Sequence, residues 1–98
     1  MRLYRAMSEA EYRQLMRTRT FQAGPNQLGG KFFAEQMQHA RRWGEWFGVP
    51  FRVMAIELPE RVASQLRRFE HLDGIGPARF AELAELAEAV ILGEATNE

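Results

Sequence analysis

The chain has 98 residues, of which 46% are hydrophobic, and its 13 basic and 13 acidic side chains give a formal net charge of zero. This length is enough for one compact domain, residues 1–98, and too short for two. The absence of cysteine excludes disulfides, thiolate nucleophiles and cysteine-ligated metals. His39 and His71 do not make a zinc site without carboxylates, so we expect no metal site. No run of about 18 apolar residues is present, so we expect no membrane insertion by this segment.

The basic residues are concentrated in the first part of the chain. Residues 1–69 hold twelve of the basic side chains against six acidic ones, whereas residues 70–98 hold one against seven. Every basic residue except Lys31 is an arginine, which pairs with phosphate and stacks on flat rings. A polyanionic ligand such as a dinucleotide or RNA would suit this surface. Alternatively, the acidic tail folds back onto the basic part.

The first part of the chain predicts a strand followed by a short helix. Residues 2–7 alternate in character, which is typical of a strand. Residues 8–11 fit a capping box, so a helix should run from there to about Arg17. Residues 18–22 form a candidate second strand. Residues 23–30 are rich in turn-forming residues, and a loop of this length is a candidate ligand-covering loop.

A glycine-hinged unit occupies the middle of the chain. Residues 29–30 are glycines that precede a short aromatic strand over residues 31–34. The run over residues 35–44 has apolar side chains at helical spacing and predicts a helix. The glycine and proline within residues 48–50 end this helix. Residues 51–58 are rich in β-prone apolar residues and predict a central strand.

The last third predicts two further helices and a strand. Pro59 suits the first turn of a helix that extends to Phe69. A glycine-rich turn over residues 73–77 leads into another predicted helix, whose apolar face is formed by Phe80, Leu83, Ala84 and Ala87. Residues 90–92 predict a last strand. The whole pattern is that of a mixed α+β domain.

Three stretches carry a resemblance to a known family. These are residues 3–12, residues 21–34 together with Ala40 and Trp43-Gly44, and residues 72–83. In them the chain resembles the C-terminal toxin domains of bacterial Rhs-type polymorphic toxins, which are ADP-ribosyltransferase-like. The resemblance implies a small α+β fold, an ADP-ribosyltransferase-like split β core with flanking helices. It also implies an antibacterial toxin domain that is secreted as part of a larger toxin, acts in the cytoplasm of the target cell and has a cognate immunity protein. For contact with that partner the acidic C-terminal region and the loop over residues 24–30 are the candidates.

The resemblance further implies which residues bind NAD as the substrate. Arg5 stands where relatives have the first-strand residue that orients the adenosine or ribose side of NAD. Phe32 stands where many relatives have a tyrosine stacked on nicotinamide, and Phe33 follows it. Glycines of the unit would let backbone N–H groups approach the pyrophosphate. The NAD-binding set is completed by Tyr4, Gly30 and Lys31.

A late glutamate is the remaining requirement of the family. Glu82 is our candidate because it lies closest to the Gly-Ile-Gly-Pro turn, and Glu85 and Glu88 remain alternatives. Breaking the nicotinamide–ribose bond builds positive charge on the ribose, so a carboxylate stabilises the transition state and can take a proton from the acceptor. Glu82 and Arg5 are therefore the candidate catalytic residues of an NAD-dependent ADP-ribosyltransferase that modifies RNA or protein.

Each of these assignments has a structural alternative. Arg5 is alternatively a solvated edge residue, and Glu82 with its neighbours is alternatively the polar stripe of a helix. Only one of Phe32 and Phe33 faces a ligand, because neighbours on a strand point to opposite faces; by resemblance it is Phe32. The alternative functions are an NAD glycohydrolase of the same fold and a non-catalytic nucleic-acid-binding module.

Overall fold

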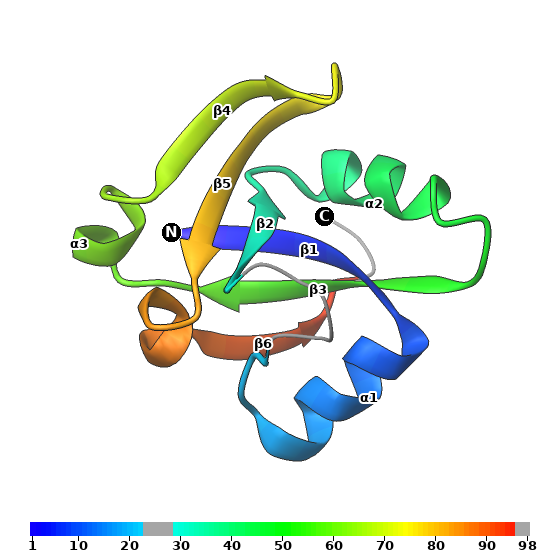
Figure 1. The fold of residues 1–98 in the computed structure, drawn as a ribbon, viewed down its shortest axis with the longest axis horizontal. Helices are drawn as coiled ribbons and strands as arrows, with labels where there is room; N and C mark the ends of the chain where they lie inside the picture. Colours follow the sequence, from blue (N-terminus) through cyan, green and yellow to red (C-terminus); the bar gives the residue numbers. More distant parts are fainter. Residues whose placement is uncertain (23–28, 96–98) are drawn as a thin grey trace.

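The computed structural model describes residues 1–22 and 29–95, drawn in colour in Figure 1. Its first helix begins as the sequence predicts, since the Ser8 hydroxyl accepts a hydrogen bond of 3.2 Å from the backbone N–H of Glu11. In chain order the elements are β1 Arg2–Ser8, α1 Glu9–Thr18, β2 Gly30–Ala34, α2 Met37–Glu45, β3 Phe51–Glu57, α3 Glu60–Ala63, β4 Arg67–Leu72, β5 Gly76–Glu82, the 3₁₀ helix η1 Glu85–Glu88 and β6 Val90–Glu94.

Within the described residues, six strands form one antiparallel sheet in the order β4-β5-β2-β1-β3-β6. β1 pairs with β3 along its whole length, and β2 pairs with β5 along its whole length. Between β1 and β2, however, the register has a single pair, Tyr4 opposite Ala34. The sheet therefore consists of two halves, β4-β5-β2 and β1-β3-β6, which extend in different directions from a narrow junction (Figure 1).

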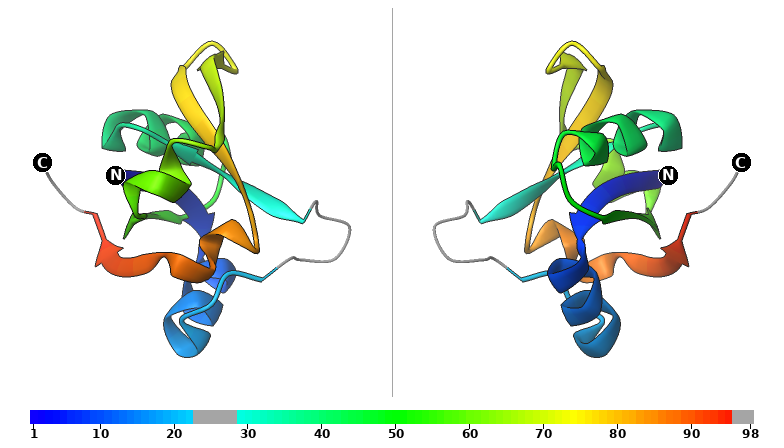
Figure 2. Two further views of the ribbon diagram at one scale, coloured as in Figure 1. Left: turned by 90° about the vertical axis from the view of Figure 1, so that its left-hand side faces the viewer. Right: turned by 90° about the vertical axis from the view of Figure 1, so that its right-hand side faces the viewer.

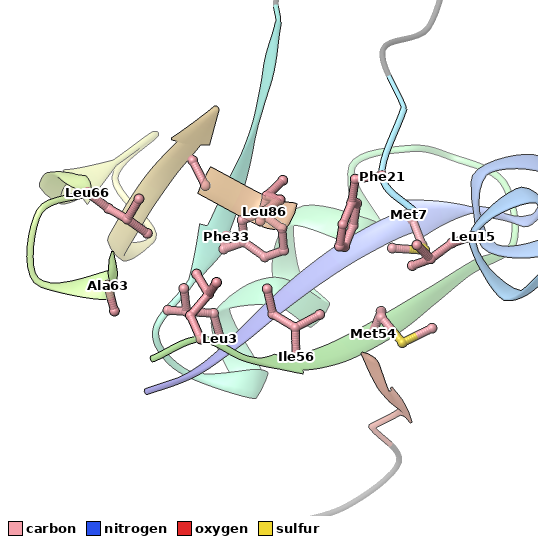
Figure 3. Close-up of a cluster of buried hydrophobic side chains, with 12 residues drawn as sticks. Leu3, Met7, Leu15, Phe21, Phe33, Met54, Ile56, Ala63, Leu66 and Leu86 are labelled. Atoms are coloured by element: carbon pink, nitrogen blue, oxygen red, sulfur yellow. The ribbon is translucent and has the colours of Figure 1, made fainter. Parts of the chain in front are cut away.

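The larger hydrophobic core lies on one face of the sheet. Leu3 of β1, Ile56 of β3 and Phe33 of β2 are each at most 1% exposed and converge there (Figure 3). Phe21, which follows α1, packs edge-on against Phe33 with 5.6 Å between ring centroids. The alternation of apolar side chains along these strands places them on this single face.

The opposite face of the sheet is covered in part by α2. Met37 and Ala40 of this helix pack with Tyr4 of β1 and Val53 of β3 in a second cluster of buried side chains. The helix lies over β1 and β3, and the β4–β5 hairpin extends beside it (Figures 1 and 2). One part of this face is therefore core, and toward the hairpin α2 contacts Asp73 through Trp43 and approaches Gly76 through His39.

Several sequence predictions are wrong, and they concern residues 18–22 and the segments after Pro59. The helix expected from Pro59 to Phe69 is limited to α3, after which the chain continues as β4. The helix expected after residue 77 is the strand β5 followed by η1, so the predicted polar stripe of glutamates does not exist. Residues 18–22 contain no strand, because α1 continues to Thr18.

The turn between β4 and β5 explains the change from helix to strand. Asp73 and Gly74 both have left-handed backbone conformations, with φ of 57° and 72°. The backbone N–H of Ile75 donates to the carbonyl of Leu72 at 3.0 Å, which closes a tight turn within the three-residue connection between β4 and β5. The chain therefore reverses at this point and adds β5 between β4 and β2.

The remaining element predictions are confirmed. They are the strands over residues 2–7, 31–34, 51–58 and 90–92, and the helices after residue 8 and over residues 35–44. Most of the predicted ligand-covering loop, residues 23–28, lies outside the described residues. None of the helices in the described segments is long and apolar enough to cross a membrane.

Candidate functional site

The separation of β1 from β2 leaves part of the β2 backbone without a strand partner. Arg5 fills this gap: its Nη1 donates a hydrogen bond of 3.1 Å to the carbonyl of Phe32. A side chain thus supplies the donor that a neighbouring strand would otherwise supply. Arg5 connects the two halves of the sheet beside their only register pair in the described residues.

A pocket of about 340 Å³ opens beside this junction. It is bounded by β1, β2, α2 and the turn between β4 and β5, and its volume is at the lower end of the roughly 300–1,000 Å³ of small-molecule sites. Five aromatic residues line it together with small alanines: Tyr4, Phe32, Phe33, Trp43 and Phe47. The site is therefore a pocket with aromatic walls, which suits a flat ring.

The two adjacent phenylalanines of β2 have different surroundings, as strand alternation requires. Phe33 is 1% exposed in the core, whereas Phe32 is 39% exposed. The side chain of Phe32 lies on the face that carries α2, because it stands opposite Phe80 and two residues from Ala34, which packs with that helix. Of the two, Phe32 is the ring that a ligand can reach.

An acidic side chain holds the rim of the pocket. The indole Nε1 of Trp43 donates to Oδ2 of Asp73 at 2.8 Å, which joins α2 to the β4–β5 turn. Asp73 stands in the turn between β4 and β5, where its backbone is left-handed, and it lines the pocket. The sequence analysis did not assign Trp43, Phe47 or Asp73 to the site. The Asp-Gly dipeptide was the available signal, since it is characteristic of tight hairpin turns.

Arg5 belongs to a partly buried cluster of charges. Its Nε and Nη2 donate to the two carboxylate oxygens of Glu11 at 2.7 and 3.1 Å. The Nζ of Lys31 lies 3.9 Å from Oε2 of the same carboxylate, and the Lys31 side chain is 4% exposed. Burial lowers the pKa of Lys31, and the Arg5 charge lowers it further, whereas Glu11 opposes both effects. Two cations thus share one anion beside the junction.

Glu82 ends β5 opposite Gly30 of β2, and it is exposed. It does not line the pocket. The register nevertheless places it on the same sheet face as Phe80 and Phe32, two residues further along β5. Its backbone N–H donates to Oε1 of Glu85 at 2.8 Å.

The three candidate glutamates differ in how their carboxylates are occupied. Glu85 accepts the Glu82 backbone N–H, and Glu88 forms an ion pair with Arg61. In the described part of the chain the Glu82 carboxylate has neither a hydrogen bond nor an ion pair. Of the three, Glu82 is the one whose carboxylate is available to a substrate.

Gly30 is required by packing at this point. A Cβ at Gly30 would lie 2.6 Å from both the Ala81 carbonyl oxygen and the Phe80 ring. The close approach of β2 to β5 therefore explains a glycine at this position, independently of the predicted role of Gly30 in NAD binding.

Comparison with known protein families, curated proteins and solved structures finds no match to this chain. The function is therefore inferred from the residues of the site.

The arrangement supplies an aromatic pocket and an unpaired carboxylate on one sheet face, whereas the side chains of Arg5 and Lys31 alternate with Tyr4 and Phe32 and lie toward the other face. Four predicted residues, Tyr4, Arg5, Phe32 and Phe33, line the pocket, and the other three, Gly30, Lys31 and Glu82, stand outside it. Within residues 1–22 and 29–95, no group of three or more acidic or histidine side chains is placed to hold a metal ion. The aromatic side chains of the pocket can stack on a flat ring, and an arginine can pair with a phosphate.

Proposed function

We propose that this domain binds NAD and transfers its ADP-ribose to an intracellular macromolecule, RNA or protein. The observation that carries the proposal is the aromatic pocket at the junction of the two sheet halves, with Phe32 reachable in its wall. A nicotinamide ring stacks on such a wall, and the cationic ring is favoured by the electron-rich faces of phenylalanine and tryptophan.

The divided sheet supports the same proposal. An ADP-ribosyltransferase-like split β core grips NAD between two small sheets, and here the halves β4-β5-β2 and β1-β3-β6 share one register pair next to the pocket. In this arrangement Arg5 has two roles. It fixes the β2 backbone at Phe32, and its guanidinium places a positive charge at the pocket that Arg5 lines. That charge favours the phosphates of NAD.

Glu82 is the proposed catalytic carboxylate. In the reaction the bond between ribose carbon 1 and the nicotinamide nitrogen breaks, and nicotinamide leaves as a neutral molecule with the bonding electrons. The same carbon bonds to an oxygen or nitrogen of the acceptor, whose proton passes to Glu82. The carboxylate also stabilises the positive charge that develops on the ribose. Its lack of a partner in the described segments supports this assignment over Glu85 and Glu88.

Release of nicotinamide from NAD, followed by chromatography with and without bacterial lysate, tests the proposal. We expect turnover by the wild type and a loss of about 10²- to 10⁴-fold in Glu82→Gln. Glu85→Gln is the matched control and should retain activity, because its carboxylate is bound to a backbone N–H. Loss in Glu85→Gln alone would move the catalytic role to that residue.

The product that carries the ADP-ribose distinguishes an NAD glycohydrolase from an ADP-ribosyltransferase. Free ADP-ribose as the sole product identifies an NAD glycohydrolase, with water as the acceptor, whereas ADP-ribose attached to macromolecules identifies a transferase. If NAD remains intact with and without lysate, the enzymatic function is excluded, and the non-catalytic nucleic-acid-binding module remains.

The biological setting in this proposal is that of an antibacterial toxin. The domain would be secreted within a larger toxin, act in the cytoplasm of the target cell and be neutralised by an immunity protein in the producer. Expression in bacteria should therefore stop growth with the wild type and permit it with Glu82→Gln. Equal growth of the two strains at equal protein levels would contradict the toxin assignment.

A further inference from the structure

Next to the pocket, three phenylalanines gather on the sheet face that carries α2, and one of them, Phe32, also lines the pocket. Phe32 of β2 stands opposite Phe80 of β5, with 4.9 Å between ring centroids. Phe69 of β4 lies opposite Ala78, and its ring centroid is 5.8 Å from that of Phe32. Phe32 is 39% exposed, and Phe69 and Phe80 are half-buried. We name these three rings together with Arg67 the aromatic surface.

Arg67 gives the aromatic surface its charge. It stands opposite Phe80 in the register, and its guanidinium carbon lies 5.2 Å from the centroid of the Phe69 ring. The two other arginines of the hairpin, Arg68 and Arg79, donate to Glu35. Arg67 is exposed and has no ion pair in the described part of the molecule. Its positive charge is therefore available to an anionic ligand.

We propose that the aromatic surface binds unpaired bases of a single-stranded nucleic acid, and that this nucleic acid is the acceptor of ADP-ribose. Exposed rings on an antiparallel sheet stack with bases of any sequence, and an arginine beside them contacts phosphate. A single strand alternates flat rings with phosphates, which matches reachable phenylalanines next to an unpaired guanidinium. The identity of the acceptor rests on the proposed function, whereas binding of the nucleic acid does not.

The position of the aromatic surface fits an acceptor. Phe32 belongs both to this surface and to the wall of the pocket, so a base stacked here lies next to a ring bound in the pocket. Glu82 is on the same face, two residues beyond Phe80, which is about 7 Å along a strand. A hydroxyl or ring nitrogen of the bound nucleotide would attack the ribose carbon, its proton would pass to Glu82, and nicotinamide would leave with the bonding electrons.

Fluorescence anisotropy of a labelled 12-nucleotide single-stranded RNA of mixed sequence, without NAD, tests the binding. We expect Phe69→Leu, which keeps an apolar side chain but removes the flat ring, to weaken binding at least about 5-fold. Phe69→Tyr should retain the affinity because it keeps the ring.

Arg67→Gln should weaken binding and reduce the slope of log affinity against log salt by about 0.7, the value for one phosphate contact on a single strand. Arg42→Gln on α2, an exposed arginine outside the aromatic surface, is the matched control and should change neither.

Three results would overturn the proposed binding. They are the absence of RNA binding by the wild type, unchanged binding in Phe69→Leu, and an effect of Arg42→Gln equal to that of Arg67→Gln. RNA binding that depends on Phe69 and Arg67 while NAD stays intact would support the surface and refute the proposed function. Nicotinamide release with ADP-ribose attached to protein alone would support the proposed function and refute the nucleic acid as its acceptor.

Discussion

Glu11 holds two cations together at the junction of the two sheet halves. Its carboxylate accepts both hydrogen bonds of the Arg5 guanidinium fork, and Lys31 lies within ion-pair distance of the same group. The side chains of Arg5 and Glu11 are 18% and 23% exposed. An ion pair in such a position contributes more than a surface pair, because its removal leaves charges without solvation.

Glu11→Gln should therefore lower the free energy of unfolding by about 1–3 kcal/mol, since two neighbouring cations lose their shared anion. Glu9→Gln is the matched control. Both residues lie in the first turn of α1 and so interact with the same helix dipole, and Glu9 pairs with Arg52 at 2.8 Å. Because the side chains of that pair are 36% and 35% exposed, its loss should cost less than about 1 kcal/mol. Urea denaturation at pH 7 measures both values, and equal losses would contradict a special role of Glu11.

At the scale of elements, local sequence signals predict the fold as far as about residue 58, except for the strand expected over residues 18–22. The strand before Ser8, the capped helix, the aromatic strand and α2 each carry their own periodicity or cap, and all four are present. Strand alternation also predicts that only one of Phe32 and Phe33 is reachable, and Phe32, which the resemblance selects, is the exposed one. In these segments local preference and tertiary packing agree.

The later part of the chain could not be predicted in this way. Residues 78–88 are rich in alanine, glutamate and leucine, which favour a helix locally. The Asp73-Gly74 turn instead inserts β5 between β4 and β2, and pairing with two neighbouring strands outweighs the helix preference. The meeting of Trp43 with Asp73 depends on this same turn, so that part of the site is not visible in local sequence patterns.

Gly30 permits the close approach of β2 to β5. In Gly30→Ala the new Cβ would meet the Ala81 carbonyl and the Phe80 ring at 2.6 Å, so the strands must move apart. We expect the free energy of unfolding to fall by about 1–3 kcal/mol, the usual cost of overpacking. At Gly29 the same addition meets nothing within 4 Å, so Gly29→Ala should leave stability unchanged or slightly raised. Thermal unfolding of both variants checks this, and an equal shift in Tm would refute the steric explanation.

At the scale of the whole molecule, Glu35 ties the β4–β5 hairpin to the rest of the fold. It lies in the link between β2 and α2, and its Oε2 accepts from Arg68 at 2.8 Å and from Arg79 at 2.7 Å. Arg79 also donates to the carbonyl of Ala63 at the end of α3. One carboxylate thus connects both hairpin strands with the connection to α2, and through Arg79 with α3. Because the hairpin carries Phe69, Phe80 and Asp73, this contact also holds the proposed acceptor surface and the pocket rim in place.

Stability should depend on pH through this carboxylate. The hydrogen bond from Arg68, followed by that from Arg79, lowers the pKa of Glu35 and outweighs the opposing effect of burial. Since the pKa is lower in the folded than in the unfolded state, the stabilisation is present above the ordinary glutamate range and is lost as the pH falls below about 4. At pH 7 we expect Glu35→Gln to lower the free energy of unfolding by about 1–3 kcal/mol, and this difference from the wild type should shrink between pH 5 and pH 3. Glu70→Gln is the matched control, because Glu70 also pairs with Arg68 but at 3.8 Å and with a side chain that is 77% exposed. It should change stability by no more than a few tenths of a kcal/mol between pH 7 and pH 3.

Urea denaturation at pH 7, 5, 4 and 3 measures the free energy of unfolding of the wild type and both variants. A difference between Glu35→Gln and the wild type that stays constant over this range would show that the carboxylate charge does not secure the hairpin.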